Sequence, residues 1–273
     1  MSKSFQLGIV VDVVPITVLD KGWEYFEVPA SIHGDPVFSD KEWNEYKAAY
    51  LADGRPTPVT SHLLGPGNMW RGGSGEYYDR ELLEFSLERT IRRMSELGVK
   101  YLGAWGGHFR CQTGFDRTKA MDQALSTVNM AADFAARYGM QIALEPQAES
   151  DTLFPRYLEG IEFAKRTGRS NVKVMADLNY FLELDQPLED ILKYPEYCLN
   201  VHIQGDGGAQ PNVGNREKTL LHLFEVLKEA GYDKGVSAAC PWVSTNGGAE
   251  VDFKYETDKT LAYLQELRAK VYR

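Results

Sequence analysis

The sequence lacks several features that would place it in large classes of protein. No run approaches the roughly 18 apolar residues that a membrane span requires, and "MSKSFQLGIVVDVVPI" at the N-terminus contains no long apolar region ending in a small-residue cleavage site. We therefore expect a cytoplasmic protein with no membrane partner. The three cysteines, Cys111, Cys198 and Cys240, are odd in number and have no C-x-x-C spacing. We expect them to be free, buried thiols.

Basic residues are also outnumbered by acidic ones. Lys and Arg number 30 against 39 Asp and Glu, which gives a net charge of -9. A surface of that sign repels phosphate backbones, so we expect no nucleic-acid partner. Apolar residues make up 43% of the 273-residue chain, which is ordinary for a compact globular protein. The length suits one large α/β domain spanning residues 1–273.

Short apolar, β-rich runs alternate along the chain with stretches of helical period. The eight runs are 7–13, 25–30, 57–62, 99–105, 141–146, 172–177, 198–203 and 235–240. This alternation is typical of βα units around a parallel sheet, and the number eight predicts a closed (β/α)8 TIM barrel. An open doubly wound sheet is the alternative, but no G-x-G-x-x-G follows the first run.

The connections between the runs differ in length. Amphipathic helices are predicted at 80–98 and 117–139, each ending at a glycine that suits a C-cap. The connection over 14–24 is too short for a full helix, so we expect an abbreviated or irregular unit there. The loop over 63–78 is long and rich in glycine and aromatic residues, and such loops after barrel strands form lids and substrate walls.

Two acids and a histidine lie at or near the ends of three consecutive runs. Glu145 in "IALEP" and Asp177 in "VMADLN" each follow three apolar residues, so each carboxylate must be paired, protonated or bound to a cation. A salt bridge to a neighbouring helix is the alternative for either acid, and His202 alone would fit a satisfied core histidine. Together, the three form a set of oxygen and nitrogen donors that suits one divalent metal ion, such as Mn²⁺, Mg²⁺, Co²⁺ or Zn²⁺.

Further polar and aromatic residues near the strand ends are candidates for binding a substrate. They are His62, Trp70, Trp105, His108, Tyr180 and Gln204. Trp70 lies in the long loop and could close over a bound substrate, because an aromatic face packs well against C–H groups. Packing within the loop is the alternative for Trp70, and ordering of its own loop is the alternative for His108.

The chain resembles the xylose isomerase-like TIM barrels, a superfamily of sugar and sugar-phosphate isomerases and epimerases. The resemblance rests on "GWEYFEVP", "LEPQAES", "ADLNY" and "VHIQGDGGAQPNVG" at strands two, five, six and seven. It implies a carbohydrate substrate, a homo-oligomer, and one divalent metal ion held by Glu145, Asp177 and His202. It further implies that Glu145 is the catalytic acid/base that moves a proton beside a carbonyl through an enediolate.

The sequence departs from this family pattern at strand eight. The family places a glutamate there, in a sequence like V-S-x-E, as the fourth ligand and second proton-transfer group. Here residues 236–239 read "VSAA", so Ala239 stands in its place. Tyr180 also replaces a histidine, and Gly208 replaces an arginine. The resemblance therefore does not indicate which sugar this protein acts on.

Several explanations of Ala239 stay open. Another acid could take over the role of the missing glutamate in proton transfer, and the candidates are Glu149, Asp151, Glu250 and Asp252. The chemistry could instead be that of a lyase, dehydratase or decarboxylase, the glutamate could have been replaced deliberately to trap a substrate, or the barrel could bind sugars without catalysis. A DNA-repair endonuclease would need several zinc ligands and a basic groove, which five histidines and the net charge disfavour. The leading hypothesis is a metal-dependent isomerase or epimerase of a ketose or sugar acid.

Overall fold

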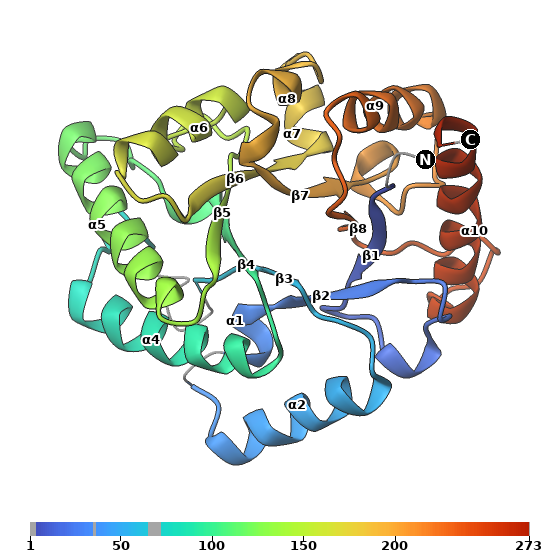
Figure 1. Cartoon of the computed structure of the whole chain (residues 1–273), viewed down its shortest axis with the longest axis horizontal. Helices are drawn as coiled ribbons and strands as arrows, with labels where there is room; N and C mark the ends of the chain where they lie inside the picture. Colours follow the sequence, from blue (N-terminus) through green and yellow to red (C-terminus); the bar gives the residue numbers. More distant parts are fainter. Residues whose placement is uncertain (1–3, 35–36, 65–71, 273) are drawn as a thin grey trace.

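A computed structural model describes residues 4–34, 37–64 and 72–272. The strands are β1 (Gln6–Val10), β2 (Tyr25–Pro29), β3 (Val59–Ser61), β4 (Tyr101–Trp105), β5 (Gln141–Glu145), β6 (Val172–Asp177), β7 (Cys198–Ile203) and β8 (Gly235–Ala238). Each strand pairs in parallel with the next, and β8 pairs in parallel with β1. The sheet is therefore a closed barrel in chain order, and the predicted (β/α)8 TIM barrel is confirmed (Figure 1).

Helices surround the strands on the outside of the barrel (Figure 1). They are α1 (Ala30–His33), α2 (Asp40–Asp53), α4 (Arg80–Glu96), α5 (Arg117–Ala136), α6 (Tyr157–Arg166), α7 (Leu178–Glu183), α8 (Asp190–Lys193), α9 (Glu217–Glu229) and α10 (Phe253–Val271). Between β1 and β2 the chain forms only the 3₁₀ helix Ile16–Val18, which confirms the short connection expected there. Among the described residues, no helix combines the length and apolar character of a membrane span.

The two predicted helices begin at the predicted residues and end two to three residues before the predicted glycines, at Glu96 and Ala136. The side chains of Asp79 and Asp116 accept hydrogen bonds from the first turns of α4 and α5. After each helix, Gly98 and Gly139 adopt left-handed backbone angles, with φ of 79° and 68°. Glycine adopts this conformation without a steric penalty, so the chain can turn there from the end of each helix toward the next strand.

The alternation of side chains along β5 directs its last residue into the barrel. Ile142 and Leu144 belong to the main hydrophobic core, whereas Ala143 belongs to a separate cluster with Met175 and Leu199. Successive residues of a strand point to opposite faces, so Glu145 shares the face of Ala143. The strand therefore places a carboxylate inside the barrel at its carboxyl end, where TIM barrels carry their functional groups.

Candidate functional site

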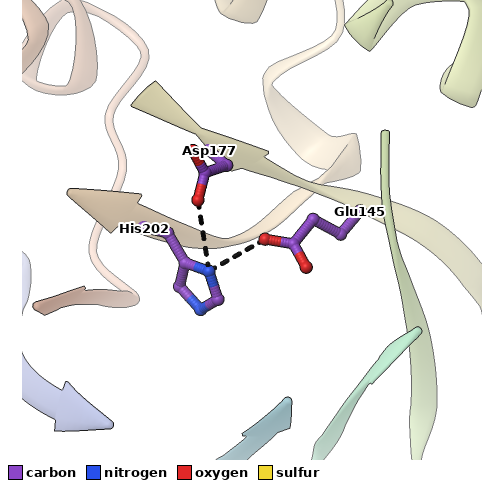
Figure 2. Close-up of side chains that lie close together, drawn as sticks. All are labelled: Glu145, Asp177 and His202. Carbon is purple, nitrogen blue, oxygen red and sulfur yellow. Dashed lines mark hydrogen bonds and ion pairs between the residues drawn. The ribbon is translucent and has the colours of Figure 1, made fainter. Parts of the chain in front are cut away.

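The three predicted metal ligands come together at the carboxyl ends of β5, β6 and β7. Asp177 and His202 are paired in register between β6 and β7. His202 Nδ1 lies 2.9 Å from Glu145 Oε1 and 3.6 Å from Asp177 Oδ2 (Figure 2). One ligand atom from each residue lies within 4.8 Å of the others, and all three side chains are buried. The arrangement provides two carboxylate oxygens and one imidazole nitrogen around a single point.

The donor set fits a divalent cation. Carboxylate and imidazole donors suit Mn²⁺, Mg²⁺, Co²⁺ and Zn²⁺. The Gln204 amide nitrogen donates to Asp177 Oδ2 at 2.7 Å and to the Ala239 carbonyl at 3.1 Å. The Gln204 side-chain oxygen is buried and has no hydrogen-bond partner among the described residues. A buried oxygen of this kind normally has a partner, and a cation or a bound ligand would provide one.

A third acid, Glu27 of β2, contacts His202 from the opposite side. Glu27 is 0% exposed, and its Oε1 lies 2.7 Å from His202 Nε2. Burial alone would lower the pKa of His202, but Glu27 and Glu145 raise it well above its usual value. Three buried carboxylates around one imidazole leave an excess of negative charge, which a divalent cation would offset.

The sequence carried the signal for Glu27. It interrupts the apolar run "YFEVP" in the same way that Glu145 interrupts "IALEP". Glu145 was chosen as a candidate because it is an acidic residue within an apolar run, and Glu27 meets the same criterion. The pairing of Glu27 with His202 is not readable from the sequence, because 175 residues separate them.

A cavity of about 420 Å³ opens at these ligands. Its volume is within the range of small-molecule sites. Four of the predicted substrate-binding residues line it, namely His62, Trp105, Tyr180 and Gln204. The predicted Trp70 lies outside the described residues.

Three of these residues form an aromatic wall. The rings of His62 and Trp105 are stacked, with centroids 5.5 Å apart. Trp105 Nε1 donates to the Tyr180 hydroxyl at 3.2 Å. His62 has a φ of 51°, an uncommon angle for a residue other than glycine, and strained residues of this kind cluster at functional sites. Burial and the nearby acids Glu145 and Asp177 raise the pKa of Tyr180, so its hydroxyl keeps its proton.

His108 packs behind this wall. Its ring lies edge-on to Trp105, with centroids 5.2 Å apart, and it is not among the described residues that line the cavity. Burial, together with the nearby His62 and Arg110, lowers the pKa of His108 to about 3. The ring therefore supports Trp105 as a neutral imidazole.

This shift predicts how stability depends on pH. The folded-state pKa of His108 lies below its unfolded value of about 6.5. Above pH 6.5 the imidazole is neutral in both states, so this group does not lower the free energy of unfolding there. As the pH falls from 6.5 toward 3, the free energy of unfolding should drop by about 1.4 kcal/mol per pH unit from this group. Urea unfolding at pH 7 and pH 5 should show a smaller drop for His108→Gln than for the unmodified protein. Equal drops, or ring protonation near pH 6 by NMR, would contradict the assignment.

Ala239 occupies the expected place of the strand-eight residue. Its N–H donates to the Ile203 carbonyl at 3.3 Å, and the residue lines the cavity beside Gln204. His202 is paired with Ser237 in register, and Ser237 points into the barrel, where it contacts Glu27. Residue 239 lies two positions further along the chain on the same face. A methyl group therefore stands where the family pattern has a carboxylate.

The four acids considered as substitutes lie elsewhere. Glu149 and Asp151 both pair with Arg110, Asp252 caps α10, and Glu250 is exposed. None of them is among the residues that line the cavity. Another acid, Asp12, does line it, just beyond the end of β1.

The cysteines only partly follow the expectation. All three are free, as predicted, and Cys198 is buried. Cys111 and Cys240 are partly exposed, so the prediction of burial was wrong for them. Cys240 follows β8 by two residues and lines the cavity. Its partial burial and the nearby Asp12 raise the pKa of its thiol.

Comparison with known proteins places the chain in a family. The sequence model of the family described as xylose isomerase-like TIM barrel matches residues 17–267. The chain belongs to this family. A D-psicose 3-epimerase of Agrobacterium fabrum is 24% identical over 228 residues, which cover 79% of this chain and 77% of that protein.

Solved structures agree at the level of the fold. A 3-keto-D-glucoside 4-epimerase from E. coli has a TM-score of 0.77 and 18% identity, covering 96% of this chain and all of that one (100%). A D-psicose 3-epimerase from Clostridium cellulolyticum, solved with D-tagatose, has a TM-score of 0.77 and 20% identity, covering 97% and 99% of the two chains. These relatives are epimerases, which agrees with the prediction of an isomerase or epimerase.

Proposed function

We propose that the protein is a metal-dependent isomerase or epimerase that moves a proton beside the carbonyl of a ketose or sugar acid. The observation that carries this proposal is the buried group of Glu145, Asp177 and His202, which faces a cavity with an aromatic wall. The sugar epimerases among the relatives support it. A homo-oligomer, a cytoplasmic location and the absence of a nucleic-acid partner stay predictions.

The residues around the cavity have separate roles in this reaction. A divalent cation at the three ligands would supply positive charge that stabilises the negative charge developing on the substrate oxygens. Glu145 removes the proton from the carbon beside the carbonyl, which leaves an enediolate. Trp105 and His62 offer flat faces for the C–H groups of the sugar. The protonated Tyr180 hydroxyl donates a hydrogen bond to an oxygen of the substrate.

We assign the second proton-transfer role to Asp12. In the closed barrel β1 lies across from β5 (Figure 1). Asp12, two residues beyond β1, and Glu145, at the end of β5, both line the cavity. A substrate carbon held between them would lose its proton to one carboxylate and receive a proton from the other. This is the geometry that inversion of a carbon centre requires.

Asp12→Asn is expected to separate proton removal from inversion. Glu145 would still exchange the substrate proton with solvent, but formation of the epimer should fall about 10²-fold or more. The measurements are deuterium uptake by NMR and epimer formation by chromatography. Glu250→Gln, an exposed acid that is not among the residues lining the cavity, is the control and should leave both rates unchanged. An Asp12→Asn protein that epimerises at the normal rate would refute this role.

The assay of the unmodified protein tests the function itself. We would incubate the Mn²⁺-loaded protein in D₂O with D-psicose, D-tagatose, D-fructose, L-ribulose and a panel of sugar acids. The proposal predicts deuterium at the carbon beside the carbonyl and a second sugar of the same mass apart from the isotope. Binding without exchange would contradict it and support a sugar-binding barrel.

A lyase or dehydratase is the second candidate, and Ala239 is the observation that favours it. An enzyme that eliminates a group does not need the second carboxylate in the position that an epimerase uses. Loss of water or of carbon from the substrate, detected by mass spectrometry, would identify this class.

A further inference from the structure

The two ring nitrogens of His202 face different surroundings. Nδ1 points to Glu145 and Asp177, and the second ring nitrogen points away from both carboxylates (Figure 2). That second nitrogen, Nε2, lies 2.7 Å from Oε1 of Glu27, deep inside the barrel. His202 thus bridges the candidate metal site and a carboxylate that does not line the cavity.

Glu27 is held in place by its other oxygen. Oε2 accepts a hydrogen bond of 2.5 Å from the Ser237 hydroxyl and one of 2.9 Å from the Asn200 amide. The Tyr25 hydroxyl lies 2.6 Å from Ser237 Oγ and 3.3 Å from Asn200 Oδ1, which fixes both donors. All these side chains are buried.

The hydrogen-bond donors around Glu27 determine which atom Oε1 contacts. Both neutral donors go to Oε2, so Oε1 is free to accept from His202 Nε2. An ionised carboxylate cannot donate, so the contact requires the proton on Nε2. When that proton is on Nε2, the neutral ring presents a lone pair at Nδ1, the atom that faces Glu145 and Asp177.

We propose that Glu27 is a positioning residue for the metal centre, which fixes the ring orientation and tautomer of His202 so that Nδ1 is available as a ligand. The inference rests on the metal centre of the proposed function. Carboxylates that accept the second N–H of a ligating histidine act in this way, and their loss typically lowers metal affinity about 10–100-fold. The role also accounts for a carboxylate that is 0% exposed, because an unpaired one would be strongly destabilising.

Glu27→Gln gives a test at the level of single atoms. Glutamine has one side-chain oxygen, and the donors Ser237 and Asn200 both require an acceptor at the Oε2 position. The oxygen therefore occupies that position, and the NH₂ group faces His202 Nε2. Because this group donates, Nε2 must accept, and the ring proton moves to Nδ1, where it competes with a metal ion.

The experiment combines two readouts on the full chain. By isothermal titration calorimetry, Glu27→Gln should bind Mn²⁺ and Zn²⁺ at least about 10-fold more weakly than the unmodified protein. By ¹⁵N NMR, the His202 ring proton should be on Nε2 in the Zn²⁺-saturated unmodified protein and on Nδ1 in the neutral ring of metal-free Glu27→Gln. The His202→Asn protein assigns the signal.

Glu256→Gln is the matched control. Glu256 is the other glutamate that is 0% exposed among the described residues, and it accepts hydrogen bonds from Thr245 and Gln210 away from the cavity. This variant loses a buried carboxylate in the same way, but it should keep normal metal affinity. Ser237→Ala serves if Glu27→Gln does not fold, because it removes one donor to Glu27 and leaves His202 unchanged. It should weaken Mn²⁺ binding about fivefold, which corresponds to one hydrogen bond.

The outcomes separate this inference from the proposed function. If the unmodified protein binds neither ion, the metal centre itself is refuted. If it binds and Glu27→Gln binds equally well, with the ring proton still on Nε2, only the role of Glu27 is refuted. Equal losses of affinity in Glu27→Gln and Glu256→Gln would also overturn it, because they would reflect general loosening of the fold.

Discussion

Glutamine in place of Glu145 is expected to stop proton transfer even when the metal site is saturated. The amide keeps an oxygen near His202 Nδ1, from which the carboxylate lies 2.9 Å, so part of the metal affinity should survive. The amide is not a base, however, and loss of general-base catalysis typically lowers the rate by about 10²–10⁴-fold. The measurement is deuterium uptake by the substrate at a Mn²⁺ concentration that saturates the variant.

Asp177→Asn is the matched comparison for Glu145→Gln. Asp177 Oδ1 accepts from the N–H groups of Asn179 and Tyr180 at the start of α7, and asparagine can keep these contacts. This variant should bind Mn²⁺ more weakly but recover exchange at high Mn²⁺ concentration, whereas Glu145→Gln should not recover. Recovery of exchange by Glu145→Gln would show that another group is the base.

Glutamate in place of Ala239 is expected to tighten metal binding. Residue 239 lines the cavity and follows the inward-pointing Ser237 by two positions, so a carboxylate there would reach toward the ligands. Because an additional anionic oxygen donor favours a divalent cation, we expect the affinity for Mn²⁺ to rise on the order of 10-fold, the scale at which changes around a metal site act. Isothermal titration calorimetry at constant pH measures the change.

Ala239→Gln separates charge from size in this prediction. The amide has nearly the volume of the carboxylate, so a steric disturbance would affect both variants, whereas the gain in affinity should be larger for glutamate. An Ala239→Glu protein with unchanged affinity would mean that strand eight does not direct this residue to the metal. Tighter metal binding by Ala239→Glu without faster epimerisation would favour Asp12 as the second proton-transfer group.

The barrel and most of the candidate site follow from local patterns in the sequence. Strand ends are marked by polar residues after apolar runs, and a closed parallel barrel brings all such ends to one rim. Glu145, Asp177 and His202 could be grouped for this reason. Strand lengths were less accurate: the run 57–62 shortens to Val59–Ser61, and His62 leaves the ladder with a left-handed backbone angle.

The parts that the sequence did not provide depend on contacts across the barrel. Glu27 and His202 come from β2 and β7, which are not neighbouring strands, so no local spacing predicts their contact. Asp12 is exposed and follows β1 by two residues, so it does not interrupt a buried run. Its candidacy comes from the cavity that it shares with Glu145.

The metal content of the purified protein is the direct test of the proposed metal centre. We would load the protein with Mn²⁺, remove free ion by gel filtration, and determine metal and protein in the same fractions. We expect one ion per chain in the unmodified protein, much less in the His202→Asn protein, and no loss in the Glu256→Gln control. No bound ion in the unmodified protein, or a full complement in His202→Asn, would contradict a metal centre built from Glu145, Asp177 and His202.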